Sequence, residues 1–378
     1  MSARVLVIGG GVAGIEAAIA LRELGGGSVE VELCSPREDF IYRPFAVGAP
    51  YGRSRPMRFG LRQLTERCGA GFRLAGIGAV DPEAQVAIAH DGDRLPYDYL
   101  IVACGARALW AVPGTIPFWG AVEEGGVQGV VRELRDGGLR KVAFTMPGIA
   151  SWGLPVYELA LLAASELEKA GTDGSRLIVV TPEEAPLALF GRRVGEGVGA
   201  LLAERGIAVV AGTHPVKFED GELSVAPGDP VQADAVVSLP RLEGRRIDGI
   251  PSDEEGFIAV DGCGWVRGLE RVLAAGDVTT FPVKQGGLST QQADVAAEAV
   301  LAAVGVGAEP EPFDPVLRAV LWTGAEPRYL YGRPSGGHGE VSELSEEEPP
   351  GWAEDAEDKI IGRYLTSFLA EVGGAAKR

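Results

Sequence analysis

Short apolar runs alternate along the chain with longer segments in which apolar residues recur at helical spacing. The runs VLVIGG, VEVELC and LIVVTP are typical of buried strands, and helical patterns cover about Val12–Leu24 and Val194–Arg205. Strands that alternate with helices in this way form parallel sheets whose faces are covered by helices. The pattern therefore predicts an α/β fold.

The length and two Gly/Pro-rich exits predict more than one domain. The chain has 378 residues, whereas single cores rarely grow beyond roughly 250–300 residues. One exit lies in YLIVACGARALWAVPG and the other in SLPRLEGRRIDGIPSDEEG, and the strand-like run RVLAAGD after the second exit is expected to return to the first domain. We therefore expect a discontinuous first domain at 1–112 and 251–312, a second domain at 113–250 and a C-terminal element at 313–378.

The C-terminal element has a different pattern. The acidic stretch SELSEEEPPGWAEDAED is interpreted as a solvated loop, and KIIGRYLTSFLAEV as a closing helix. The apolar stripe of this helix consists of Ile360, Ile361, Tyr364, Leu365, Phe368, Leu369 and Val372, with Lys359 and Arg363 outside it. Because the surrounding charge is acidic, we expect the stripe to dock on the protein's own body or on a second subunit of a homodimer. A peripheral membrane contact is the alternative.

Charge and composition exclude several classes of protein. A net charge of −18, with no concentrated basic patch, makes nucleic acid a poor partner. The cysteines and histidines lack the spacing of a disulfide framework or a metal site; they are Cys34, Cys68, Cys104, Cys263, His90, His214 and His338. With neither a long apolar run nor a signal peptide before RVLVIGG, we expect a cytoplasmic protein, with peripheral contact at the inner face of the membrane as the alternative.

The first strand ends in a glycine-rich turn. VLVIGGGVAGIEAA places Gly9, Gly11 and Gly14 in GxGxxG spacing between a strand and a helix. The first glycine allows the tight turn, the second lets a pyrophosphate approach the backbone, and the third permits close packing of helix and strand. This context predicts a dinucleotide site.

The end of the second strand departs from the usual dinucleotide pattern. Cys34 and Ser35 stand where an acidic residue usually binds the ribose, and Glu32 lies two residues earlier. Glu32 is interpreted as a solvent-facing strand residue. Ser35 or backbone groups are then expected to hold the ribose hydroxyls.

Two further segments resemble motifs of the flavoproteins that have two dinucleotide-binding domains. YDYLIVACGA, Tyr97–Ala106, resembles their second motif, and VLAAGDVTTFP, Val272–Pro282, resembles the third. The resemblance implies two Rossmann-like three-layer domains of the FAD/NAD(P)-binding type and a non-covalent FAD. It also implies roles for individual residues: Asp277 would bind a ribityl hydroxyl, and Ala103, Gly105, Gly276, Arg43 and Pro44 would neighbour the cofactor.

The segment FPVKQGGLSTQQADVAAEAVLAAV is expected to form a loop that leads into a long helix. It is similar to a stretch of the sulfide:quinone oxidoreductases in which Lys284, Gln285 and Gly286 would face the flavin and a quinone-side pocket. A helix N-terminus and a lysine there would stabilise negative charge on the reduced flavin. The alternative is a solvated loop lysine.

A second strand-turn-helix begins at VAFTMPGIASWGLPVYEL. It carries Met146, Pro147 and Trp152 where a nicotinamide-binding domain needs glycines, and Pro147 has no N–H to donate. WGLPVYEL resembles the sulfide:quinone oxidoreductases and the flavocytochrome c sulfide dehydrogenases, whose second domain lacks the nicotinamide role. An NAD(P)H site of unusual shape is the alternative.

The redox cysteines of those two families are absent from the matching positions. Ser151 and Trp152 precede Tyr157-Glu158 where one cysteine is expected, and no cysteine follows Cys263. The close cysteine pair of the disulfide reductases is also missing after the second strand.

The resemblance implies an enzyme that passes electrons from an unidentified donor through FAD to a quinone or another small-molecule acceptor. Lys284 is the candidate catalytic side chain. Two alternatives stay open: an NAD(P)H:quinone reductase of the type II NADH dehydrogenase kind, and a redox-silent flavin-binding interaction protein.

Overall fold

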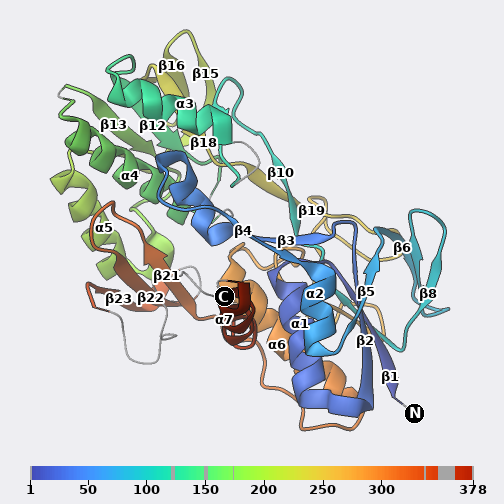
Figure 1. Ribbon diagram of the computed structural model, residues 1–378. Helices are drawn as coiled ribbons and strands as arrows, with labels where there is room; N and C mark the ends of the chain where they lie inside the picture. Colours follow the sequence, from blue (N-terminus) through green and yellow to red (C-terminus); the bar gives the residue numbers. More distant parts are fainter. Residues whose placement is uncertain are drawn as a thin grey trace.

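The computed structural model describes residues 2–120, 124–148, 152–172, 174–335, 338–347 and 362–376 (Figure 1). Its first sheet has five parallel strands in the order β20 (Val272–Ala274), β9 (Tyr99–Val102), β1 (Ala3–Ile8), β2 (Val29–Ser35) and β5 (Gly71–Leu74). β20 comes from the run RVLAAGD, so a late part of the chain lies beside the N-terminal strands.

Both faces of the first sheet are covered. Val5 and Val7 of β1 pack with α1 (Val12–Gly25) and α6 (Gly286–Ala303) in one core. Leu6 and Ile8 point to the opposite face, where they pack against an antiparallel sheet. This sheet consists of β6 (Ile77–Asp81), β7 (Val86–Ala89) and β8 (Arg94–Pro96). The alternation along β1 follows from the period of two in a strand, and it produces three layers.

The second sheet repeats this arrangement. Its parallel strands run in the order β11 (Ile116–Pro117), β18 (Ala235–Ser238), β12 (Lys141–Thr145), β13 (Arg176–Val180) and β14 (Ala208–Val210). Helices α3 (Glu124–Arg135), α4 (Leu154–Ala170) and α5 (Arg192–Glu204) accompany it, and the other face carries β15 (His214–Glu219), β16 (Glu222–Ala226) and β17 (Val231–Gln232). The prediction of two Rossmann-like three-layer units is confirmed.

Two connections join the two parts of the molecule. Strands β10 (Ala106–Leu109) and β19 (Arg241–Gly244) pair antiparallel where the chain passes between the parts (Figure 1). The hairpin of β3 (Asp39–Tyr42) and β4 (Met57–Gly60) encloses the 3₁₀ segment η2 (Arg43–Tyr51), which packs into the core of the second part. The remaining short helices are α2 (Leu61–Cys68), η1 (Gly26–Ser28) and η3 (Ala188–Phe190).

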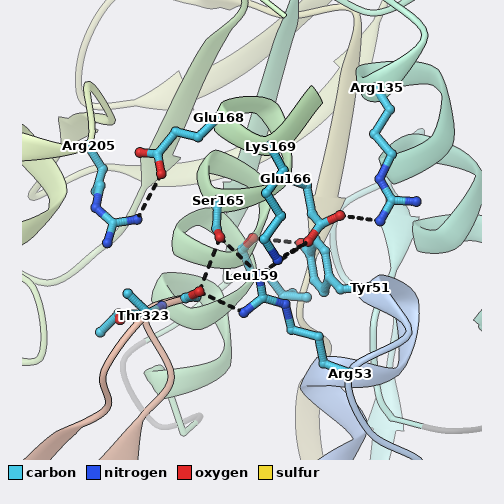
Figure 2. Close-up of polar contacts among 12 residues, drawn as sticks. Tyr51, Arg53, Arg135, Leu159, Ser165, Glu166, Glu168, Lys169, Arg205 and Thr323 are labelled. Atoms are coloured by element: carbon cyan, nitrogen blue, oxygen red, sulfur yellow. Dashed lines mark hydrogen bonds and ion pairs between the residues drawn. The ribbon is translucent and has the colours of Figure 1, made fainter. Parts of the chain in front are cut away.

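A network of charged groups centred on Glu166 braces the second connection (Figure 2). Glu166 of α4 is nearly buried and receives Arg53 at 3.2 Å, Lys169 at 3.3 Å and also Arg135. Arg53 also donates to the carbonyl oxygen of Gly324 at 2.9 Å. A segment from the N-terminal part, helix α4 and the C-terminal element are thereby tied together at one point.

The C-terminal element contains a three-stranded antiparallel sheet of β21 (Leu317–Leu321), β22 (Arg328–Ser335) and β23 (His338–Ser345). The prediction of a solvated loop is wrong for Ser342–Ser345, because this stretch pairs with β22 and Leu344 packs against the second core. Residues 348–358 of the acidic stretch lie outside the described residues.

The closing helix α7 (Leu365–Ala376) begins later than the pattern predicts. Gly362 has φ +114°, a left-handed conformation that a helix cannot continue through. Leu365 and Leu369 are buried in the core that α1 and α6 form on the first sheet, and Tyr364 and Phe368 pack beside them. The expectation that the stripe docks on the protein's own body is met for these four residues; Lys359, Ile360 and Ile361 lie outside the described part.

Candidate functional site

One large cavity, of about 1220 Å³, lies where the first sheet, the second part of the molecule and the C-terminal element meet. It exceeds the ~300–1,000 Å³ of typical small-molecule pockets. Eleven of the thirteen site residues expected from the sequence line it: Gly9, Gly11, Ser35, Arg43, Pro44, Ala103, Gly105, Asp277, Lys284, Gln285 and Gly286. The other two, Gly14 and Gly276, do not line it.

The glycine turn leaves no room for side chains except toward the cavity. A Cβ atom on Gly9 would lie 2.2 Å from the carbonyl oxygen of Ala103, and one on Gly14 would lie 1.8 Å from that of Gly9. A Cβ atom on Gly11 would instead meet no atom within 4 Å. Gly11 is the N-cap of α1, and no side chain caps that helix end. The first N–H groups of α1 therefore face a space suited to a phosphate group.

The end of β2 agrees with the expectation for Glu32. Its carboxylate pairs with Arg73 at 3.0 Å, on the strand β5 beside it. Cys34 is fully buried, and burial raises the pKa of its thiol to about 12. Ser35 lines the cavity, and its hydroxyl oxygen accepts the N–H of Arg37 at 3.1 Å.

Asp277 and Lys284 lie on one wall of the cavity, at the start of α6. Burial raises the pKa of Asp277, although nearby Lys284 and a hydrogen bond from Ser289 at 3.2 Å oppose the shift. Burial lowers the pKa of Lys284 to about 8, opposed by the attraction of Asp277. The Lys284 ammonium donates to the carbonyl oxygen of Thr279 and lies 3.9 Å from the ring centre of Phe257. The alternative of a solvated loop lysine is therefore wrong.

Gln285 and Gln292 hold the backbone around this wall. Gln285 caps α6 by accepting the N–H of Leu288 at 2.8 Å, and it donates to the carbonyl oxygen of Arg318 at 3.0 Å. Gln292 accepts the N–H of Gly276 at 2.7 Å, which fixes the turn before Asp277. The N-terminus of α6 is thus fixed to both the first sheet and the C-terminal sheet.

The cavity is basic although the protein is strongly acidic. Its charged lining residues are Arg37, Arg43, Arg245, Arg246, Arg318, Arg363 and Lys284 against Asp39, Asp277, Asp294 and Glu158. Burial lowers the pKa of the Arg43 guanidinium, and the nearby Arg37 adds to the shift. An anionic ligand bound between these guanidinium groups would reduce the repulsion between them.

The other half of the cavity is apolar and aromatic. It is lined by Phe118, Trp119, Trp152, Leu154, Leu239 and Val320, which come from the second part of the molecule and from β21. The guanidinium of Arg43 lies 5.3 Å from the ring centre of Trp119, where the two halves meet. This half suits a flat, apolar molecule.

The turn after β12 lies in the second part of the molecule. Side chains of this part occupy the space next to the turn. The hydroxyl of Tyr157 donates to Glu183, which lies just beyond the end of β13, the strand next to β12. Both side chains are buried. Trp152 packs on Phe190, with ring centres 5.8 Å apart. Residues 149–151 of this turn, which include Ser151, lie outside the described residues.

The four cysteines are free. Cys104 lines the cavity, and burial raises the pKa of its thiol to about 11, opposed by Arg245. A thiol with such a pKa is protonated near neutral pH and is a poor nucleophile.

Comparison with known proteins identifies a known domain in the first part of the chain. Residues 3–143 match the model of the pyridine nucleotide-disulphide oxidoreductase family. This part of the chain carries a domain of that family. The protein is an FAD-dependent oxidoreductase of the sulfide-quinone reductase and ferredoxin reductase kind. The recognition made from the three flavoprotein motifs is confirmed.

Two curated relatives match most of the chain. The chain is 26% identical over 307 residues to the sulfide-quinone reductase of Aquifex aeolicus, covering 75% of this chain and 70% of that protein. It is 27% identical over 307 residues to the ferredoxin–NAD(+) reductase subunit of the benzene 1,2-dioxygenase system of Pseudomonas putida, covering 76% and 70%.

A solved structure shows the same fold. The sulfide:quinone oxidoreductase of Aquifex aeolicus superposes with a TM-score of 0.81 at 22% identity, covering 91% of this chain and 87% of that one. In the described part of this flavoprotein, no helix is both long and apolar enough to cross a bilayer.

Sequence reasoning missed several lining residues. Trp119, Arg245 and Arg318 lie outside the flavoprotein motifs, and only the tertiary fold brings them to the cavity. Glu183 had a usable signal, because it follows the second strand of the second sheet at the place where Rossmann domains often carry a ribose-binding acid.

Proposed function

We propose that this flavoprotein passes electrons from a donor other than NAD(P)H, through FAD in the cavity, to a quinone-like acceptor in the apolar half. The continuity of the cavity carries the proposal. The phosphate-sized space at Gly11 and the apolar walls around Trp119 belong to one continuous cavity, in which a cofactor and a flat second molecule would be neighbours.

The residues present fit FAD. The N–H groups at the start of α1 and the basic side chains around Arg43 would hold its diphosphate, and Asp277 would accept a hydrogen bond from the ribityl chain. FAD, when bound, takes up an electron pair from the donor and delivers it to the acceptor. Lys284 and the N-terminus of α6 would supply positive charge where the reduced cofactor becomes negative.

The second part of the molecule supports a donor other than NAD(P)H. A dinucleotide needs a glycine turn, free N–H groups at a helix start and an acidic group open to the ribose. Here Glu183 already accepts a hydrogen bond from Tyr157, and Trp152 occupies the turn. The redox-silent alternative is set aside, because the curated relatives that the chain resembles are named oxidoreductases.

The alternative is an NAD(P)H-dependent reductase. It is favoured by one observation, namely that the second parallel sheet keeps an acidic residue, Glu183, beyond the strand where the ribose would lie. This reading requires Tyr157 to move away from Glu183 when the nucleotide binds.

Anaerobic reoxidation tests the acceptor. We would load the protein with FAD, establish its stoichiometry, reduce it with light and add a soluble quinone. We expect reoxidation that saturates with quinone, and a KM raised several-fold in Trp119→Leu. Trp110→Leu is the matched control, since Trp110 is 45% exposed and does not line the cavity. Reoxidation that is linear in quinone concentration and equal in both variants would rule out a quinone site beside Trp119.

A further inference from the structure

The start of the C-terminal helix forms part of the wall of the cofactor cavity. Gly362, Arg363, Thr366 and Ser367 line the cavity, although they are more than 50 residues beyond the third flavoprotein motif. The helix itself is anchored on the first core through Leu365 and Leu369. Figure 1 shows α7 beside α1 and α6, between the two parts of the molecule.

A carboxylate of α1 holds the start of α7. The two carboxylate oxygens of Glu16 accept the N–H groups of Tyr364 at 2.8 Å and Leu365 at 2.7 Å. The side chain of Glu16 is completely buried. These N–H groups would have no partner within their own helix, and a negative group at a helix N-terminus is stabilised by the helix dipole. Glu16 therefore acts as an N-cap supplied by another helix.

Gly362 fits closely over this contact. A Cβ atom at Gly362 would lie 2.8 Å from Oε2 of Glu16, and its φ of +114° already excludes ordinary side chains. The approach of the chain to Glu16 thus depends on a glycine, and α7 begins directly after it.

A second carboxyl group lies beside Glu16. Asp294 of α6 lines the cavity, and its buried Oδ1 has no hydrogen-bond partner in the described part of the chain. Burial raises the pKa of Asp294 to about 8, and the charge of Glu16 adds to this shift. Burial also raises the pKa of Glu16, opposed by the N–H groups of Tyr364 and Leu365.

The other charges around the pair are few. Arg363 on α7 favours ionisation of Asp294, while Glu298 on α6 disfavours it. Arg363 lies 3.7 Å from Glu298 and is largely exposed. On α1, the exposed Glu23 adds negative charge near Tyr364. The positive charge of Arg363 is thus largely exposed to solvent, while Glu16 is fully buried and Asp294 is half-buried at the cavity wall.

We propose that Glu16 and Asp294 form a proton-controlled latch that holds α7 over the cofactor cavity. While the pair keeps a proton, Glu16 binds the start of α7 and the cavity is closed on this side. When the proton is lost, repulsion between the buried Glu16 carboxylate and the half-buried Asp294 carboxylate releases the start of α7 and opens the cavity to cofactor exchange. The link to exchange rests on the proposed binding of FAD in this cavity, whereas the latch itself does not.

The direction with pH follows from linkage. In the closed state the pKa of Asp294 is about 8 instead of 3.8, so between these values the closed state keeps a proton that an open state releases. Closure is therefore strongest below about pH 4, weakens as the pH rises toward 8, and changes no further above it. One proton changes the ratio of open to closed by at most about tenfold per pH unit.

Amide hydrogen exchange tests the latch without cofactor. We would measure protection factors, corrected for intrinsic exchange, for the amides of Tyr364 and Leu365 between pH 6 and 9. Wild-type protection should fall several-fold toward pH 8, at most about tenfold per pH unit, and then level off. Asp294→Asn removes the group with the raised pKa and should give a flat profile over this range. Glu16→Gln leaves Asp294 without its charged neighbour, so the fall in protection should move to lower pH. Glu23→Gln removes a nearby exposed charge and should keep the wild-type profile.

Two outcomes would overturn the latch: protection that does not change with pH in the wild type, or an Asp294→Asn profile equal to that of the wild type. Glu16→Gln guards against a folding defect of the aspartate variant.

The release rate of FAD, followed by flavin fluorescence, tests the link to the cavity. It should rise with pH in the wild type and stay constant in Asp294→Asn. If amide hydrogen exchange depends on pH but the rate of FAD release does not, the latch does not control access to the cofactor. A chain that binds no FAD would instead refute the proposed function and leave the exchange result to decide the latch.

Discussion

Gly11, at the start of α1, leaves open the space in which a phosphate group of the cofactor would lie. It makes no close contact, and the position of its missing Cβ atom lies free at the cavity wall. The N–H groups behind it have no side-chain cap. A larger side chain there would occupy the space of the phosphate without disturbing any protein contact.

We therefore expect Gly11→Val to weaken FAD binding while the protein stays folded. The loss should be at least about tenfold in Kd, equivalent to about 1.4 kcal/mol, as read from quenching of flavin fluorescence. Gly27→Val is the control, since a Cβ atom there also meets nothing within 4 Å but lies away from the cavity. Equal affinity in the two variants would show that the diphosphate does not approach Gly11.

Lys284 combines burial with an anionic neighbour, and both facts bear on the cofactor. We expect Lys284→Met to make the midpoint potential of bound FAD more negative, because a positive charge that favours the reduced form is lost. The shift should be on the order of 30 mV, which corresponds to about 1.4 kcal/mol for two electrons.

The charge of Lys284 should also depend on pH. With a pKa of about 8, its ammonium is present below that pH and lost above it, so the potential difference between wild type and Lys284→Met should shrink above about pH 8. Spectroelectrochemical titrations at pH 6.5 and 9.5 check this. A constant difference would mean that Lys284 keeps its proton throughout.

At the scale of elements, the Glu166 network couples parts of the chain that lie far apart in the sequence. Arg53 precedes β4, Arg135 ends α3, and Glu166 lies in α4 (Figure 2). Glu166 is nearly buried, whereas its partners are partly exposed. Solvent therefore screens these ion pairs less than it screens a pair between two exposed side chains.

We expect Glu166→Gln to lower the free energy of unfolding by about 1–3 kcal/mol, the range for hydrogen bonds to charged groups. Denaturant titration measures this. Glu196→Gln breaks an exposed pair with Arg192 on α5 and should change stability by less than about 0.5 kcal/mol. Similar losses in both variants would contradict a special role for the network.

Elements with strong periodicity could be predicted from the sequence, and those set by tertiary contacts could not. The helix expected at about Val12–Leu24 is α1, Val12–Gly25, because its apolar residues repeat at helical spacing. Ser342–Ser345 reads as a polar loop, yet it forms part of β23 since β22 supplies its hydrogen bonds. The late start of α7 depends on Gly362 meeting Glu16, a contact 346 residues apart that no local pattern contains.

At the scale of the whole molecule, the sequence led to the correct family because three separate motifs come together around one cavity. Gly11, Ala103 and Asp277 belong to different segments and line the same space. The aromatic half around Trp119 could not be predicted, because it is formed by the approach of the second part of the molecule and of β21. The hydrogen bond between Tyr157 and Glu183 also depends on tertiary structure. The sequence shows that the turn after β12 is poor in glycine, but it does not show that Glu183 lies beside Tyr157.

Anaerobic reduction of the bound flavin tests the central proposal most directly. NADH, NADPH and sulfide would be added separately to the FAD-loaded protein, and the flavin absorbance followed over time. The proposal predicts no rapid bleaching by either nicotinamide, together with full bleaching by light and reoxidation by quinone. Rapid bleaching by NADH or NADPH would contradict it, since it would show that the second part of the molecule binds a nicotinamide despite Tyr157 and Trp152.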